Sequence, residues 1–481
     1  MKKGQKNLLL VALALVVMFV IVFAPIEGLE PMGRLYLGTT IGMLVLWFTN
    51  AVPAPVTFFI QLGLLTLVIP RISDVKAVAA FPITMTNLSS ASWALLACAF
   101  FMVAIVEKSG LARRIALMIL NAVGPKPKRF VAGILFAGAF MNLFLPAAMS
   151  VSALLTSIVG GIVIDYNLDK NTSNLSKSIY LAVGVGTIAG NIFIQTAGAP
   201  AITATNIIST TFGVTLNYLE YMKMGLPLAI LMDIFAFFLI TRLFPSELES
   251  LPGGGEYIKN KLAELGAWTP SEIKTGIVLL VTIVCWMTGS KTGLNASTVA
   301  LLAVAVLLCP VIGVAEFKEV APKVPWGTLL VCGSSLGLAS GLVNYGAAEW
   351  LVNTLVSATN LTAMPIVVVL IGALIIMAIC ACMFTVRVSA VSAILPCAAM
   401  LGTAIAANHA GFNAMGFTLV CFYPLLFTVI IPIHTPYTLL PQAAGGFESK
   451  DMVKVMVPYV ILTLLSCIVL YFTYWHLVGL T

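Results

Sequence analysis

Arg387 is the residue whose chemistry is hardest to explain by packing alone. It lies between two uncharged, mostly apolar stretches, 365–384 and 392–407. A guanidinium stays charged at physiological pH, and a charge at the centre of a membrane helix costs roughly 2.5–3.5 kcal/mol on insertion scales. A cation kept there against this cost indicates a binding function, and the simplest ligand for a buried cation is an anion.

Two other titratable residues occur in apolar surroundings, and each has more than one interpretation. Asp233 is the only carboxylate deep within an apolar segment, so it either pairs with Arg387 or carries a proton as a coupling residue. His434 either donates to an anion or titrates, since histidine changes charge near neutral pH. Alternatively, carbonyl groups of a nearby helix break satisfy its ring.

Small and polar residues at interruptions of the apolar segments complete the candidate substrate site. Besides Arg387 and His434, it comprises Thr385, Val386, Val388, Ser389, Pro146, Ala147, Ala148, Gln195, Thr196, Gly198, Pro200, Thr435, Pro436 and Thr438. The hydroxyl and amide groups could donate to an anion, although threonine also commonly bonds the backbone of its own helix. The glycine and the prolines at positions 200 and 436 are better explained as helix breakers than as ligands.

The composition excludes an ordinary soluble domain. Apolar residues make up 60% of the chain and charged residues 9%, with a mean hydropathy of +1.07, whereas soluble domains carry about a quarter charged residues. The nine cysteines fall mostly in apolar runs without CxxC spacing, which indicates small buried hydrophobic residues rather than disulfides or metal ligands. The net charge of +7 reflects membrane topology and does not indicate nucleic-acid binding.

The candidate site residues lie within or between apolar runs that have the length of membrane spans. These runs predict the helices that position the residues. We predict an all-α polytopic protein with eleven spans, near 8–25, 33–50, 54–70, 91–107, 178–208, 224–243, 271–289, 296–313, 326–343, 413–440 and 452–475. Two further regions, about 130–163 and 365–407, are interrupted at 145–148 and 385–388 and read as re-entrant helical hairpins. Non-helical backbone at such depth is tolerated only where it is buried in protein or lines a wet cavity.

The distribution of basic residues supports an orientation for these spans. With the N-terminus in the cytoplasm, 19 of the 25 Lys and Arg residues fall on the inner side and five on the outer side, with Arg387 between them. This is the bias that the positive-inside rule describes. It predicts a multi-pass protein of the cell (inner) membrane with an extracytoplasmic C-terminus.

Tryptophans and interruptions of the apolar runs recur in pairs along the chain at a nearly constant spacing. The pairs are Trp47 with Trp286, Trp93 with Trp326, Ala147 with Arg387, and Ala197 with Thr435, at spacings of 239, 233, 240 and 238 residues. Five spans and one hairpin in each copy would place the second copy upside down, an arrangement typical of transporters that bind substrate near the membrane midplane.

The repeat predicts four regions. They are an N-terminal helix (1–32), a first repeat (33–245, hairpin about 130–163, broken helix about 178–208), a cytoplasmic linker (246–270) and a second repeat (271–481, hairpin about 365–407, broken helix about 413–440).

Four segments carry a resemblance to a known family. They are Val-Pro-Trp-Gly-Thr-Leu-Leu at 324–330, Leu-Ala-Ser-Gly-Leu at 338–342, Pro-Ile-His-Thr-Pro-Tyr-Thr at 432–438 and Lys-Asp-Met-Val-Lys at 450–454. From about residue 33 onward the chain resembles the divalent anion/sodium symporter family, the di- and tricarboxylate transporters of the ion-transporter superfamily. The resemblance implies that the hairpins, the broken spans and spans six and eleven form a moving transport domain. It also implies a dimerising scaffold and an elevator-like motion.

The chain departs from this family at both hairpin tips. The family places Ser-Asn-Thr there, where these residues hold sodium and the substrate carboxylates, whereas this chain has Pro-Ala-Ala at 146–148 and Val-Arg-Val at 386–388. We therefore expect no cofactor and no sodium at the usual sites, although backbone carbonyls remain available. We hypothesise that the fixed charge of Arg387 replaces the sodium and attracts a carboxylate without a co-transported cation.

These observations predict a secondary transporter of a small organic anion, by resemblance a di- or tricarboxylate, that works by sodium-independent exchange. Its partners would be the anion, membrane lipid and a second copy of the chain. Two alternatives remain: a sodium- or proton-coupled symporter, and the membrane subunit of a multi-component transporter. The sequence has no nucleotide-binding motif, no HExxH motif and only one deep carboxylate where an aspartyl dyad needs two. We therefore expect neither an ATP-driven pump nor an enzyme.

Overall fold

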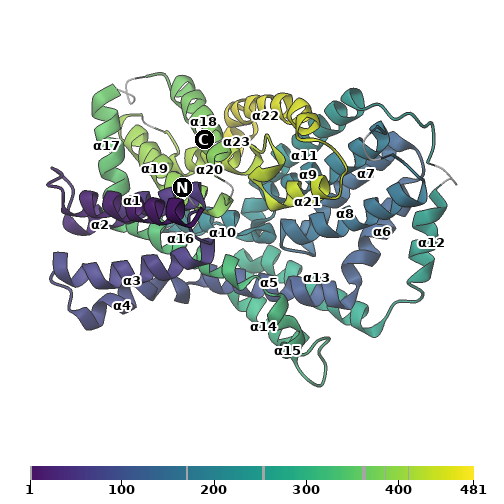
Figure 1. Ribbon diagram of the computed structural model, residues 1–481, viewed down its shortest axis with the longest axis horizontal. Helices are drawn as coiled ribbons and strands as arrows, with labels where there is room; N and C mark the ends of the chain where they lie inside the picture. Colours follow the sequence, from purple (N-terminus) through teal and green to yellow (C-terminus); the bar gives the residue numbers. More distant parts are fainter. Residues whose placement is uncertain are drawn as a thin grey trace.

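The computed structural model describes residues 3–169, 172–251, 255–359, 364–384, 386–409 and 411–480. Every regular element within these ranges is helical (Figure 1). The first half contains α1 (Lys3–Phe23), α2 (Pro31–Thr49), α3 (Ala54–Ile72), α4 (Ala77–Met85), α5 (Ala91–Ser109), α6 (Leu111–Val123), α7 (Pro127–Phe140), α8 (Ala148–Asp165), α9 (Asn174–Phe193), α10 (Ala199–Phe212) and α11 (Tyr218–Leu243), followed by α12 (Glu256–Glu264).

The second half continues with a further series of helices. It contains α13 (Pro270–Thr292), α14 (Ala296–Leu308), α15 (Phe317–Val320), α16 (Trp326–Asn344), α17 (Ala347–Thr359), α18 (Ile366–Met383), α19 (Arg387–Asn408), α20 (Ala414–Phe427), α21 (Pro436–Ala443), α22 (Ser449–Phe472) and α23 (Tyr474–Leu477). Short 3-10 turns include η1 (Thr86–Ser89), η2 (Met141–Leu143), η3 (Gln195–Ala197), η5 (Ala321–Lys323) and η7 (Pro432–His434).

The all-helical membrane fold expected from hydropathy is confirmed. Among the described residues, ten helices are long and apolar enough to cross a membrane by length and composition, and α14 and α20 are shorter apolar helices. These ten include three hairpin arms, α8, α18 and α19, so the division into eleven spans and two re-entrant hairpins stays a prediction.

The two halves match in the order and spacing of their helices. The second arms of the hairpins, α8 and α19, begin 239 residues apart (387 − 148), and the helices after the breaks, α10 and α21, begin 237 apart (436 − 199). The short helices α6 and α17, which hydropathy alone did not predict, have 13 residues each and begin 236 apart (347 − 111).

Four interruptions lie within the apolar regions. The hairpins break between α7–η2 and α8 and between α18 and α19, and the long spans break at η3, between α9 and α10, and at η7, between α20 and α21. Pro200 and Pro436 occupy the first turns of α10 and α21. Proline is tolerated there because the first N–H groups of a helix have no acceptor within it.

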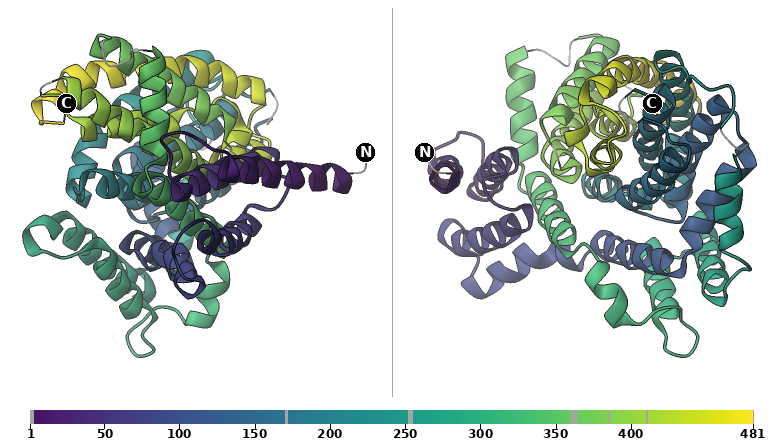
Figure 2. Two further views of the ribbon diagram at one scale, coloured as in Figure 1. Left: turned by 90° about the vertical axis from the view of Figure 1, so that its left-hand side faces the viewer. Right: turned by 45° about the vertical axis from the view of Figure 1, so that its right-hand side comes forward.

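The buried apolar residues of the described chain form one large cluster and three smaller ones. Helices α1–α4 lie at one end of the molecule and the linker helix α12 at the other, and the N-terminal end of α1 extends away from the bundle (Figures 1 and 2). A smaller core joins α1–α4 with Leu338 of α16, whereas a large core joins helices of both halves. In this large core α9 packs against α7, α11 and α20, so both broken spans share one buried interior.

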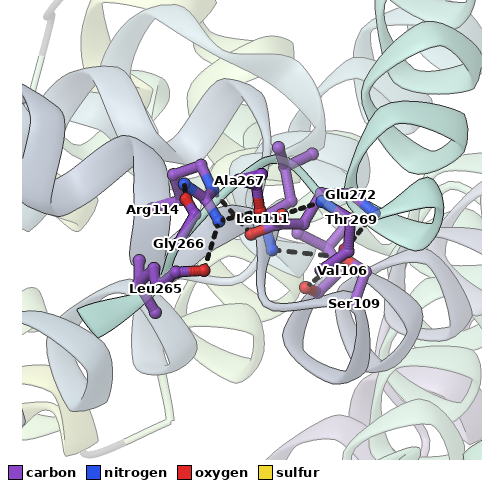
Figure 3. A network of polar contacts seen from close by, with 9 residues as sticks. All are labelled: Val106, Ser109, Leu111, Arg114, Leu265, Gly266, Ala267, Thr269 and Glu272. Atoms are coloured by element: carbon purple, nitrogen blue, oxygen red, sulfur yellow. Dashed lines mark hydrogen bonds and ion pairs between the residues drawn. The ribbon is translucent and has the colours of Figure 1, made fainter. Parts of the chain in front are cut away.

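The linker between the halves is attached to α6 by a buried arginine (Figure 3). The Nε of Arg114 donates to Glu272 Oε1 at 2.7 Å, and both side chains are at most 5% exposed. The Nη atoms of Arg114 donate to the carbonyl groups of Leu265, Gly266 and Ala267 at 3.0–3.1 Å. The guanidinium also lies 5.0 Å from the ring centroid of Trp268.

Candidate functional site

A cavity of about 490 Å³ lies where the four interruptions meet. Residues of both hairpin tips and of both broken spans line it, together with one side of α5 and the start of α16. The segments come from positions as far apart as 100 and 437, so the cavity exists only because the two halves fold against each other. Its volume is in the range of small-molecule binding sites.

The four helices that follow the interruptions begin at this cavity, and none of the four has a side-chain cap. The residues before α8, α10, α19 and α21 are Ala147, Gly198, Val386 and Thr435, and none of their side chains accepts from the helix that follows. The first N–H groups of a helix have no acceptor inside it and carry partial positive charge. Four such ends at one cavity make it favourable for an anion.

Arg387 is the first residue of α19, and its guanidinium holds two other helix ends together. Its Nη1 donates to the carbonyl of Ala381 at 2.6 Å, and its Nη2 donates to the carbonyl of Thr428 at 2.8 Å. A longer bond of 3.4 Å joins Nη1 to the carbonyl of Leu425. These carbonyls lie at the C-terminal ends of α18 and α20, where a cation is favoured.

No described carboxylate neutralises the charge of Arg387. The side chain is 6% exposed and lines the cavity, and it forms no ion pair with any described residue. Its Nε is buried without a hydrogen-bond partner in the described part of the chain. The pairing with Asp233 considered from the sequence is therefore absent. Asp233 lies on α11 with Oδ1 buried and likewise unpartnered among described residues.

Nine of the sixteen predicted substrate-site residues line the cavity. They are Ala147, Ala148, Gly198, Pro200, Val386, Arg387, Val388, Thr435 and Pro436. Six others do not line it: Pro146, Gln195, Thr196, Ser389, His434 and Thr438. Thr385 lies outside the described residues.

The polar residues away from the cavity mostly satisfy local structure. Thr438 Oγ1 donates to the carbonyl of Pro432 at 2.9 Å, and His434 Nδ1 accepts from the N–H of Ile430 at 3.3 Å. Gln195 Nε2 donates to Thr205 Oγ1 at 3.1 Å. Gln195 lines a second, uncharged polar cavity between the start of α5, α10 and the α13–α14 connection.

The structure adds polar residues to the cavity that sequence reasoning missed. Ser150, Asn191, Thr328 and Tyr437 line it. Ser150 is the third residue of α8, a position that the predicted hairpin break could have indicated. No sequence signal singled out Asn191, which faces the cavity because the chain turns back at η3.

A close approach at this turn favours glycine at position 198. A Cβ added at position 198 would lie 2.8 Å from Asn191 Oδ1, which is closer than carbon and oxygen normally pack. The Asn191 amide donates to the carbonyl of Thr187 at 3.2 Å. The glycine therefore lets a polar side chain of α9 pack directly against the start of α10.

The mouth of the cavity carries the remaining charged residues of its lining, Glu107 and Lys323, which are both exposed. Next to them, Lys108 forms an ion pair with Glu319, and the hydrogen bond between them lowers the pKa of the Glu319 carboxyl.

Among the described residues, no group of three or more His, Cys, Asp or Glu side chains is arranged to hold a metal ion.

Comparisons with solved structures agree with this fold. The YdaH transporter of Alcanivorax borkumensis matches with a TM-score of 0.54 at 14% identity, over 100% of this chain and 99% of that chain. MtrF of Neisseria gonorrhoeae, from a class of antimetabolite efflux pumps, matches with a TM-score of 0.55 at 13% identity, over 98% and 94%. At such low identity the likeness shows the fold alone.

Comparisons of sequence identify the family. The chain is 28% identical over 465 residues to a membrane protein of Cupriavidus necator, covering 94% of this chain and 89% of the relative. It is 24% identical over 487 residues to the sodium-dependent dicarboxylate transporter SdcS of Staphylococcus saprophyticus, covering 94% and 88%. Residues 5–481 match the sodium:sulfate symporter transmembrane region. The expected family is therefore confirmed: the chain belongs to the sodium:sulfate symporter family and is a multi-pass secondary transporter of anions rather than an enzyme.

Proposed function

We propose that this protein exchanges small organic anions across the cell membrane without sodium, with Arg387 as the fixed cation of the site. The di- and tricarboxylates are the substrates expected from the relatives, one of which is named as a dicarboxylate transporter. The observation that carries the proposal is the arrangement of Arg387. Its guanidinium holds the C-terminal carbonyls of two helices, lines the cavity and has no carboxylate partner among the described residues.

The location of Arg387 makes a mobile cation unnecessary at this helix break. Carbonyl groups that converge from two helix ends are good ligands for a hard cation. Here the guanidinium already donates to them, so its positive charge is present in every state of the transport cycle. An anion bound beside Arg387 and at the N–H groups of the surrounding helix starts would neutralise that charge.

Exchange follows from the cost of moving a charged site through a membrane. An empty site carries the unpaired charge of Arg387, and such a charge is expensive in a low-dielectric environment. A loaded site is closer to neutral and crosses more easily. Net movement of one anion without a return anion would therefore be slow, whereas replacement of one anion by another would be fast.

The position of the two cavities supports an elevator-like motion between inverted repeats. Helix α5 lines the Arg387 cavity with its C-terminal half, up to Glu107, and the second polar cavity with Ala91, Ser92 and Leu95 at its start. In the predicted topology the end of α5 faces the cytoplasm. The state described here would then be open inward. We further propose that α5, α16 and the helices packed on them belong to a dimerising scaffold.

Substitution of Arg387 in the purified protein tests this function. Arg387→Gln in proteoliposomes loaded with anion should lose exchange by about thirtyfold or more, because removing one partner of a buried charge interaction costs at least about 2 kcal/mol. Exchange by the unaltered protein should be the same in sodium and in choline salts. Unchanged exchange in the Arg387→Gln variant would remove the proposal.

A coupled symporter is the second candidate function, and two observations favour it. A relative is named as sodium-dependent, and Asp233 has a buried oxygen without a partner among the described residues, which is suitable for carrying a proton. Uptake that requires a sodium or proton gradient, without a return anion, would establish this alternative. Transport by the purified chain alone would exclude a requirement for a separate binding subunit.

A further inference from the structure

We propose that the preferred substrate is an organic acid with an apolar body of several carbon atoms, rather than a compact anion such as sulfate. This inference rests on the proposed anion site at Arg387 and adds the chemistry of the rest of the ligand. It follows from a cavity lining that combines one buried cation with mostly apolar residues.

Arg387 is the one buried cation among the described residues that line the cavity. The starts of α8, α10, α19 and α21 add the partial positive charge of their first N–H groups. The other charged residues of the lining, Glu107 and Lys323, are exposed at the mouth. One acid group can thus be bound in the interior, and a second acid group must reach the mouth, where water and Lys323 are available.

Most of the remaining lining residues of the cavity are apolar. Phe100, Val103 and Ala104 of α5 face the cavity, and Leu426 of α20 and Ala153 of α8 extend the apolar surface. All three α5 residues are less than 10% exposed. Most of the exposed surface inside the cavity therefore comes from carbon atoms that cannot replace the hydration of an anion.

This wall discriminates between substrates according to their shape. Sulfate carries charge on every side, so placing it here would leave oxygen atoms against carbon without hydrogen bonds, which is unfavourable. A hydrocarbon chain gains free energy from the same wall, and each buried methylene group raises affinity by about three- to fourfold. The apolar body would lie along α5 while the acid group faces Arg387.

A series of anions of increasing length tests the inference on the full-length protein. Succinate, adipate and suberate differ by two methylene groups each, and sulfate is the compact reference. In competition for exchange in proteoliposomes, we expect affinity to rise by up to about tenfold for each pair of methylene groups until the cavity is filled. Sulfate should be the weakest competitor.

Variants of α5 show whether this selectivity arises at the proposed wall. Val103→Thr and Ala104→Ser add hydroxyl groups to the wall and should reduce the suberate-to-succinate affinity ratio by about threefold or more. Ala97→Ser places the same change on α5 away from the cavity lining and should leave the ratio unchanged. A merely destabilised protein would lose affinity for all anions alike, without a change of ratio.

The outcomes separate this inference from the function on which it rests. Sulfate binding as tightly as suberate, in an Arg387-dependent manner, would overturn the inference and leave the proposed anion site intact. A suberate-to-succinate affinity ratio that is unchanged by Val103→Thr and Ala104→Ser would also overturn the inference. Binding that does not depend on Arg387 would overturn both.

Discussion

Two arginines are buried in the part of the chain that the structure describes, and they differ in how their charge is balanced. Arg114 and Arg387 are 4% and 6% exposed, and each donates to three backbone carbonyls. Arg114 also binds Glu272 (Figure 3) and lies over Trp268, whereas Arg387 has no carboxylate partner among the described residues and its Nε is unpartnered. The charge of Arg114 is paired within the fold, whereas Arg387 lines a cavity without a carboxylate partner among the described residues.

The difference indicates which buried cation is structural and which is functional. Burial alone does not distinguish them, and neither does bonding to carbonyls. A paired cation that bridges α6 and the linker is explained by stability, because it satisfies groups that would otherwise be unpaired. A cation that remains unpaired beside a cavity is explained by a ligand that supplies the missing charge.

The largest expected effect comes from breaking the paired arginine. Arg114→Met leaves Glu272 buried and uncompensated, and we expect the free energy of unfolding to fall by about 3–5 kcal/mol. Thermal unfolding in detergent measures this loss. Anion affinity of the remaining folded protein should be unchanged, because the pair lies on α6 and α13 and does not line the Arg387 cavity.

The double variant Arg114→Met with Glu272→Leu is the matched control. Removing both charges replaces the buried pair by apolar side chains, which is often neutral for stability, so most of the lost stability should return. If Arg114→Met lowered anion affinity without lowering stability, the distinction between the two arginines would be wrong.

The sequence was most informative where local chemistry decides structure. The predicted interruptions agree with the observed helix starts at Ala148 and Arg387, because proline and a charge both oppose a continuous apolar helix at those points. The short helices α6 and α17 were missed. They are amphipathic or partly polar and only 13 residues long, so hydropathy over a span-length window does not detect them.

The cavity lining could be predicted only in part, because it depends on which way side chains turn at each break. Gln195 and Gly198 are three residues apart, yet they line different cavities, since the 3-10 turn η3 rotates the chain between them. The carbonyl partners of Arg387 at positions 425 and 428 belong to another helix, and no local pattern brings that helix end to the hairpin tip. The apolar wall of α5 likewise comes from a distant segment.

The second prediction concerns a variant in which Arg387 gains a carboxylate partner, as Arg114 has in Glu272. Ala147→Asp places a carboxylate at the start of α8, in the same cavity as Arg387. The new charge should compete with the substrate and weaken anion affinity by about ten- to a hundredfold, while it stabilises the protein measured without anion. Isothermal titration and thermal unfolding measure the two effects.

Ala147→Asn separates charge from shape in this experiment. Asparagine has nearly the same size and caps a helix as well as aspartate does, but it brings no charge. We expect its anion affinity to remain within about threefold of the unaltered protein. Equal losses for the two variants would mean that space, not charge balance, limits binding at this position.

The third prediction keeps the charge of Arg387 and changes its geometry. Lysine at this position retains a positive charge, but its single ammonium cannot reach the carbonyls of Ala381 and Thr428 as the planar guanidinium does. Losing one such charged hydrogen bond should cost about 1.5–3 kcal/mol of stability. Anion affinity should fall by less than about tenfold, because the charge still faces the cavity. If Arg387→Lys weakened anion binding as much as Arg387→Gln, the planar geometry of the guanidinium, rather than its unpaired charge, would determine anion binding.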